Sequence, residues 1–321
     1  MTKFRLGLYL WVVGFLISGL AAARADSVQT INLPVNDLVY DAVTRKIYAS
    51  VPSSAPNNRG NTITVVDPFT GAIGASVFIG SEPNVLALSD DGRYLYVGLE
   101  GAGAIRRFEI ATLTAGLQFS LGRDSYTGTL YAADIEVQPG NANVIAVARR
   151  NKQYSPSHAG VAIFDNGVQR SATTPEHTGS NVLEWGATAN RLYGLDSASS
   201  SFGFRRLDVA ANGVTEVDSR TTAIYGFNVT MRFANGEIYA SDGTVLNAES
   251  RVFEGSFPSI DHAQAVCPDA ARNRVAFFLG NRLVICDRPT FRYVGELAVS
   301  NNDTTGFGAS SRLVRWGDDG L

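Results

Sequence analysis

The three histidines of this chain are the side chains best suited to metal binding or to proton transfer near neutral pH. His177 follows Glu176 and His262 follows Asp261, whereas His158 closes a basic segment. Imidazole beside a carboxylate can ligate a metal or act as an acid–base group. None of the three has a local metal-ligand spacing, so solvated or loop-stabilising side chains are the competing interpretation, which we favour. The sequence therefore predicts no catalytic residue, no metal site and no cofactor.

The chain has one dense basic cluster, formed by Arg149, Arg150 and Lys152 and followed by Tyr154. Such a cluster could hold an anionic ligand, for example a carboxylate or a sugar acid. The alternative is a long solvated loop. The predicted ligand-binding residues combine this cluster with the histidine positions: Arg149, Arg150, Lys152, Tyr154, His158, His177, Asp261 and His262.

A weak internal repeat, with a period of about 48 residues, must position these side chains. Each copy has an apolar pair, a polar turn and a run of aromatic or branched residues. Repeats of this length indicate stacked units that cannot bury a core alone. The copies begin near residues 39, 87, 136, 184, 231, 266 and 314.

Within the first copy, alternating residues and turn signals predict four short strands. They are Leu38–Tyr40, Lys46–Val51, Thr62–Val66 and Ala75–Ile79. Four antiparallel strands per repeat, arranged radially, form a β-propeller blade. The third strand and its turn recur, so Asp67, Asp165, Asp208 and Asp287 are predicted to cap equivalent turns.

Two segments carry a resemblance to a known family. The runs SDDGRYLYV at residues 89–97 and TITVVDPFTGAI at residues 62–73 resemble the YVTN-type, YncE-like seven-bladed propellers. The lactonase-like and quinoprotein amine dehydrogenase-like propellers are more distantly similar. The resemblance covers residues 28–321 and implies an all-β fold with seven four-stranded antiparallel blades, but it transfers no catalytic residue.

The ends of the repeat array predict how the ring closes. Val28–Leu33 reads as an extra strand, which is expected to close the last blade. The seventh copy begins at Leu313 and contains only its first strand, so the last blade is expected to be incomplete, as in a truncated sequence. A six-bladed ring with two leftover end segments is the alternative.

Cys267 and Cys286 are the only cysteines. They fall at the ends of the first and third strands of the sixth copy, with one strand between them. A flat sheet would separate them by about 9–10 Å, whereas a disulfide needs Cα atoms within about 7 Å. Strand twist could close this gap, so a disulfide and a pair of buried thiols both remain open.

The first 25 residues predict a signal peptide, which leaves residues 26–321 as the propeller domain. A basic start at Lys3 and Arg5 precedes an apolar stretch, and Ala23-Arg24-Ala25 forms a cleavage signal. An uncleaved anchor is the rival interpretation. The full chain has a net charge of −3, and cleavage would make the net charge more negative. A negative net charge disfavours nucleic acid as a partner. We expect a secreted or periplasmic protein without stable membrane insertion.

Propeller topology places the loops between second and third strands, and those between successive blades, on one face. All three histidines and the basic cluster fall on these loops, where binding residues are common. The expected function is therefore a module that binds protein, glycan or a small molecule. A lactonase-type or lyase-type enzyme is the alternative, and docking of a separate redox cofactor subunit has no residue in its favour.

Overall fold

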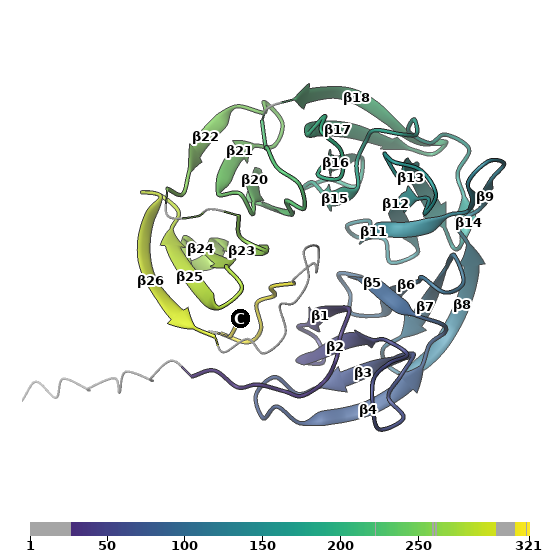
Figure 1. Ribbon diagram of the computed structural model, residues 1–321, viewed down its shortest axis with the longest axis horizontal. Helices are drawn as coiled ribbons and strands as arrows, with labels where there is room; N and C mark the ends of the chain where they lie inside the picture. The colour runs from purple at the N-terminus through teal and green to yellow at the C-terminus, as the bar shows by residue number, and fades with distance from the viewer. Residues whose placement is uncertain (1–26, 222, 259, 261, 300–311, 319) are drawn as a thin grey trace, which may run out of the picture.

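The computed structural model describes residues 27–221, 223–258, 260, 262–299, 312–318, 320 and 321. These residues form a ring of antiparallel sheets (Figure 1), as the repeat predicts. The signal peptide predicted for residues 1–25 lies outside the described part of the chain. Within the described ranges, no helix is long and apolar enough to cross a membrane.

Six sheets have four strands each, and the strands pair in chain order from the axis outward. The first three blades are β1 (Asp37–Asp41), β2 (Lys46–Val51), β3 (Thr62–Val66), β4 (Ile73–Phe78); β5 (Pro83–Leu88), β6 (Tyr94–Leu99), β7 (Ala104–Glu109), β8 (Thr114–Ser120); and β11 (Tyr131–Val137), β12 (Val144–Arg150), β13 (His158–Asp165), β14 (Val168–Gln169). The next three are β15 (Val182–Trp185), β16 (Arg191–Leu195), β17 (Gly203–Ala210), β18 (Gly213–Thr221); β19 (Met231–Ala234), β20 (Glu237–Ala240), β21 (Thr244–Asn247), β22 (Phe253–Ser256); and β23 (Ala265–Asp269), β24 (Arg274–Phe278), β25 (Arg282–Asp287), β26 (Arg292–Ala298). A small hairpin, β9 (Arg123–Asp124) with β10 (Gly128–Thr129), and the 3-10 turn η1 (Ala270–Arg272) complete the elements.

The turns between outer strands follow from local side-chain chemistry. The carboxylate of Asp67 accepts hydrogen bonds from the backbone N–H groups of Phe69, at 2.9 Å, and Thr70, at 3.2 Å, and Asp287 accepts one from Thr290. The predicted turn cap is confirmed at these two positions. At the other two positions the contacts of the carboxylates are with arginines rather than with the turn backbone: Asp165 pairs with Arg170 and Asp208 pairs with Arg191.

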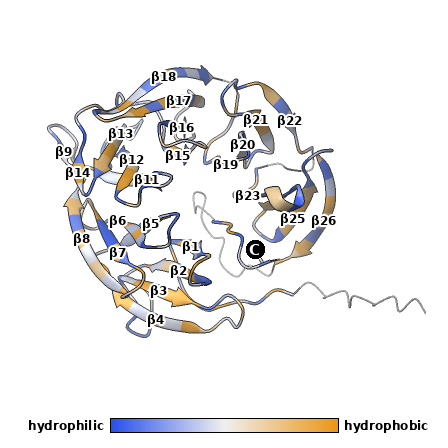
Figure 2. Ribbon diagram, turned by 180° about the vertical axis from the view of Figure 1, so that it is seen from behind, coloured by the Kyte–Doolittle hydropathy of each residue, from blue (hydrophilic) through white to orange (hydrophobic). Residues whose placement is uncertain are grey.

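The hydrophobic core lies between neighbouring blades. Val144, Ala146 and Leu183 are fully buried, and Trp185 completes their cluster between the third and fourth blades. Burying each large apolar side chain stabilises the fold by about 1.5–3 kcal/mol. In the outermost strand β8, more and less hydrophobic residues alternate (Figure 2), as expected for a strand with one face towards solvent.

Carboxylates on inner strands join successive blades. The carboxylate of Asp37 accepts the N–H of Leu86 at 2.9 Å, and that of Asp134 accepts the N–H of Leu183 at 2.8 Å. Glu184 accepts the N–H of Phe233 at 3.2 Å. Each acceptor precedes its donor by 49 residues, close to one repeat, so each bond ties a blade to its successor.

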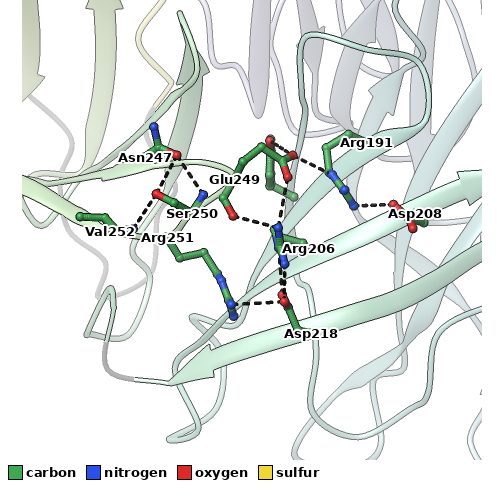
Figure 3. Close-up of polar contacts among 10 residues, drawn as sticks. Arg191, Arg206, Asp208, Asp218, Asn247, Glu249, Ser250, Arg251 and Val252 are labelled. Atoms are coloured by element: carbon green, nitrogen blue, oxygen red, sulfur yellow. Dashed lines mark hydrogen bonds and ion pairs between the residues drawn. The ribbon is translucent and has the colours of Figure 1, made fainter.

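A polar network joins the fourth and fifth blades further from the axis (Figure 3). Glu249, in the turn that follows β21, accepts hydrogen bonds from Arg191, at 2.7 Å, and from Arg206, at 3.2 Å. Arg206 also pairs with Asp218 of β18 at 2.5 Å, and Arg251 approaches the same carboxylate at 3.2 Å. These contacts bind the outer strands of one blade to the turn of the next.

The residues that the structure describes do not form the expected seventh blade. Six blades are complete, and Leu313 and Val314 of the seventh copy lie in an extended segment with no strand partner in the described part of the chain. That segment lies between β23 and β1, beside the C label (Figure 1). It reaches the first blade through Arg312 and Trp316, and the sixth through an ion pair between Arg315 and Asp269.

The expected closing strand at Val28–Leu33 is also wrong. These residues form no strand, and their contact with the first blade is a hydrogen bond from Gln29 to the carbonyl oxygen of Thr70 at 3.1 Å. A closing strand needs an outer strand beside which to pair, and the seventh copy provides none among the described residues.

The disulfide alternative is not realised, because no disulfide joins Cys267 and Cys286. Cys267 pairs with Ala276, which pairs with Ile285, whereas Cys286 pairs with Val275. Residues directly opposite in a sheet share a face, so the two cysteines point to opposite faces as well as lying two strands apart. Strand twist cannot overcome this change of face.

The first prediction concerns the inner-strand carboxylates. Asp37→Ala should lower the free energy of unfolding by about 3 kcal/mol, because it leaves the half-buried Arg312 without its carboxylate and the buried backbone N–H of Leu86 without its acceptor. Urea unfolding measures this loss. The matched control Glu254→Ala, on the exposed strand β22, should change stability by less than about 0.5 kcal/mol. Equal stabilities for the two variants would contradict the structural role of Asp37.

Candidate ligand-binding site

The basic cluster of the sequence does not form a free positive patch. Arg149 is buried and donates to the carbonyl oxygen of Gly160 at 3.4 Å, and burial lowers the pKa of its guanidinium. Arg150 and Lys152 both bind the carboxylate of Glu100, at 2.5 and 2.8 Å. The two accessible charges are therefore paired with a carboxylate of the same chain, and binding of an anionic ligand by this cluster stays a prediction. Sequence spacing did not identify Glu100 because it belongs to the preceding blade.

Tyr154 lies beyond this cluster and is 56% exposed. It is not among the described residues that line either of the two cavities along the ring axis.

The three histidines do not converge. His158 is buried in β13, and burial, together with nearby Arg205, lowers its pKa to about 4. His177 is exposed, with its backbone N–H bonded to the carbonyl oxygen of His158 at 2.9 Å. His262 alone lines the cavity at the ring axis, and Asp261 lies outside the described residues. Among the described residues, no group of three or more His, Cys, Asp or Glu side chains is placed to hold a metal ion.

A cavity of about 1610 Å³ opens at one mouth of the central channel. It lies on the face predicted from topology, because its lining comes from segments that enter inner strands and from loops between second and third strands. The neutral polar side chains of the lining are Asn36, Asn84, Asn181, Ser197, Ser200, Asn228, Thr230, Ser241 and Gln264. The charged ones are Asp37, Asp134, Arg150, Arg232, Asp242 and Arg312, together with the titratable His262.

The position of these residues within the repeat predicts that they face the channel, whereas chemical motifs do not identify them. Asn36, Asn84 and Asn181 each immediately precede the channel-facing position of their copies, and Asp37 and Asp134 occupy that position. Side chains at equivalent inner-strand positions point towards the axis in every blade. An alignment of the copies of the repeat therefore predicts these residues.

A layer of charged side chains forms the floor of the cavity. Arg312 binds Asp37 through two bonds of 2.7 Å, and Arg232 binds Glu184 at 2.6 Å. Both arginines also line a second cavity of about 220 Å³, so they lie between the two. The bidentate pair of Arg312 and Asp37 is of a strong and directional kind.

Two further carboxyl groups of this layer have no bonded cation within the described residues. Asp134 accepts backbone N–H groups, and burial raises its pKa to about 6, although Arg312 opposes the shift. Burial, followed by the charges of Glu184 and Asp134, raises the pKa of Glu136 well above its usual range. The channel therefore holds carboxyl groups that bind protons at a higher pH than ordinary carboxylates do.

An aromatic group forms part of the cavity rim. Tyr225 and Phe227 are 67% and 59% exposed, and both rings contact Phe202, which is 5% exposed. All three residues line the cavity.

These features define the class of the protein: a β-propeller with a large cavity, lined by both polar and apolar side chains, at one mouth of its channel. Its sequence matches no protein-family model and no curated protein, so the resemblance to YVTN-type propellers stays a prediction. A chain of Kuenenia stuttgartiensis hydrazine synthase is similar in structure, with a TM-score of 0.61 and 14% identity over 86% of this chain and 90% of that one. The Cps50 (Swd1) β-propeller domain of Myceliophteria thermophila has a TM-score of 0.63 and 13% identity over 86% and 89%. At these identities the similarity establishes the fold alone.

The second prediction is a pH dependence that arises from Asp134. Its pKa is higher in the folded chain than the usual value of about 4 in an unfolded one, so its contribution to stability is complete below pH 4 and is lost as the pH rises through 6. Relative to Asp134→Asn, the free energy of unfolding of the wild type should fall by on the order of 3 kcal/mol between pH 4 and pH 7.

Urea unfolding at several pH values measures this difference. Glu136→Gln should change the pH dependence in the same direction, whereas Glu254→Gln, on the exposed face of β22, should leave it unchanged. A difference between wild type and Asp134→Asn that stays constant with pH would contradict the assignment.

Proposed function

We propose that this β-propeller is a binding module whose ligand enters the cavity at the channel mouth. The cavity itself is the observation that carries the proposal. Binding sites are concave, largely preformed and lined by a few well-placed polar groups. Here the inner strands hold amides and carboxylates around one axis, and ion pairs fix the floor.

The lactonase or lyase alternative has less support. It relied on His177, His262 and Asp261 forming one polar site, and His177 does not line the cavity whereas His262 does. The fold carries no argument for either activity, because one fold hosts many unrelated functions.

The third prediction tests the cavity with a bulky substitution. Thr230 lines it and occupies the repeat position equivalent to Asp37 and Asp134. Thr230→Trp should fill the channel mouth, while Thr215→Trp, on the exposed strand β18, is the matched control. A panel of sugars, sugar acids, amino acids and short peptides should contain a ligand that raises the Tm of wild type and of Thr215→Trp.

The same ligand should leave the Tm of Thr230→Trp unchanged, and calorimetry should show binding lost in that variant. A ligand that binds Thr230→Trp as tightly as the wild type would place the site elsewhere. If no member of the panel shifts the Tm of the wild type, the proposed function fails.

We also propose that the protein is exported. The basic start, the apolar stretch and the Ala23-Arg24-Ala25 sequence support a cleaved signal peptide. The fourth prediction is that expression of the full chain in a bacterial host yields a protein outside the cytoplasm whose N-terminal residue is Asp26. Mass spectrometry of the fractionated product measures this. Ala25→Arg should block cleavage, and a cytoplasmic, unprocessed wild type would overturn the proposal.

A further inference from the structure

Two aromatic side chains on the cavity rim are exposed in a way that folding does not explain. Tyr225 and Phe227 lie in the connection between β18 and β19 and are 67% and 59% exposed. Single exposed apolar residues are common on protein surfaces. These two differ because they share one buried partner and line one cavity.

The structure holds the aromatic pair in place. The ring of Phe202 lies 4.5 Å from that of Tyr225 and 4.8 Å from that of Phe227, measured between centroids. Asp242 accepts the backbone N–H of Tyr225 at 3.2 Å, and the neighbouring side chain of Ile224 is 1% exposed. Fixed aromatic rings lose little conformational entropy when a ligand binds, which favours their use as a binding platform.

The connection also has a backbone suited to presenting both rings. Gly226, between the two aromatic residues, has φ +137°, a value that a residue with a side chain rarely adopts. Phe202 itself has φ +42°, which is uncommon for a bulky residue. Backbone conformations of this kind tend to occur at ligand-binding sites.

The rest of the cavity fits a neutral ligand with many hydroxyl groups. The described lining residues include three arginines and three aspartates. Of the aspartates, Asp37 is paired with an arginine, whereas Asp134 and Asp242 accept backbone N–H groups. Arg312 is bound to Asp37, Arg232 to Glu184, and Arg150 to Glu100, so none of the three cations is available without breaking a pair. Amide and hydroxyl side chains are the most numerous of the other polar lining residues, and they donate and accept hydrogen bonds without charge.

We propose that the cavity binds a neutral oligosaccharide, with the apolar face of one sugar ring stacked on Tyr225 and Phe227. The proposal rests on the proposed function and names its ligand class. A sugar ring combines a face of C–H groups, which packs against aromatic rings, with hydroxyl groups around its edge. Amide side chains such as Asn84 and Asn228 line the same cavity and are suited to bind that edge. The cavity volume of about 1610 Å³ exceeds the 300–1,000 Å³ typical of small-molecule sites, so it has room for several sugar units.

The fifth prediction tests this proposal on an immobilised array. The array carries short neutral gluco-, manno- and galacto-oligosaccharides, the corresponding uronic acid oligosaccharides, and acidic, basic and apolar peptides. Wild-type protein should bind a neutral oligosaccharide. Tyr225→Ala and Phe227→Ala should each weaken that binding about tenfold, because each removes one face of the aromatic platform. Both residues are exposed, so the variants should keep the wild-type circular dichroism and Tm.

Tyr126→Ala is the matched control, because Tyr126 is 84% exposed and does not line the cavity. It should bind as the wild type does. Preference for uronic acids or for peptides over neutral sugars would overturn the proposal, as would binding that both rim variants retain. In these cases loss of binding in Thr230→Trp would still support the cavity as the binding site. If the wild type binds no array member, that result counts against both the proposed binding function and the proposed oligosaccharide ligand.

Discussion

The hydrogen bond from an inner-strand carboxylate to the backbone of the next blade is the contact on which the rest of this ring depends. Asp37, Asp134 and Glu184 each accept an N–H group 49 residues further along the chain. Neighbouring blades otherwise meet through apolar packing, which has no fixed direction. A charge-assisted bond at the axis has a direction, so it sets the height and rotation at which these three pairs of blades meet.

The same carboxylates give the channel its chemistry. Arg312 enters from the C-terminal segment and binds Asp37 at the place where β23 and β1 have no contact comparable to those between the other inner strands. Within the ring, Arg232 of β19 forms an ion pair with Glu184 of β15. The remaining acids, Asp134 and Glu136, have raised pKa values because burial disfavours their charged forms. Ring closure and channel polarity therefore have a common origin in one register of the inner strands.

Paired charges also decide what kind of ligand the cavity suits. Lys152 and Arg150 share Glu100, and Lys152 lies 3.9 Å from the ring centroid of Tyr131, so the most basic loop of the sequence contributes little free positive charge. The exposed chemistry of the mouth is aromatic and neutral polar instead. Tyr225 and Phe227 belong to a connection between blades that no other copy reproduces, which fits a site built from the residues that vary between repeats.

The sequence by itself determined the blade. The bounds of β2 and β3 are those expected from alternation and turn residues, and β1 and β4 differ from expectation by one or two residues at each end. Alternation and turn chemistry act over a few residues, so a single copy contains the information. Asp67 and Asp287 cap their turns for the same local reason.

Only the tertiary structure decided the blade count, the state of the cysteines and the site. The described residues form six blades rather than seven, and Arg312 lies between the last and the first. This number depends on packing around the whole ring, which no single repeat encodes. Cys267 and Cys286 lie on opposite faces because a register set by three strands puts them there. The cavity gathers side chains from six blades, each separated from the next by about one repeat. Propeller topology alone predicts the face on which the cavity opens. Which charges meet in the cavity depends on contacts between residues about 50 positions apart, such as that of Arg150 with Glu100.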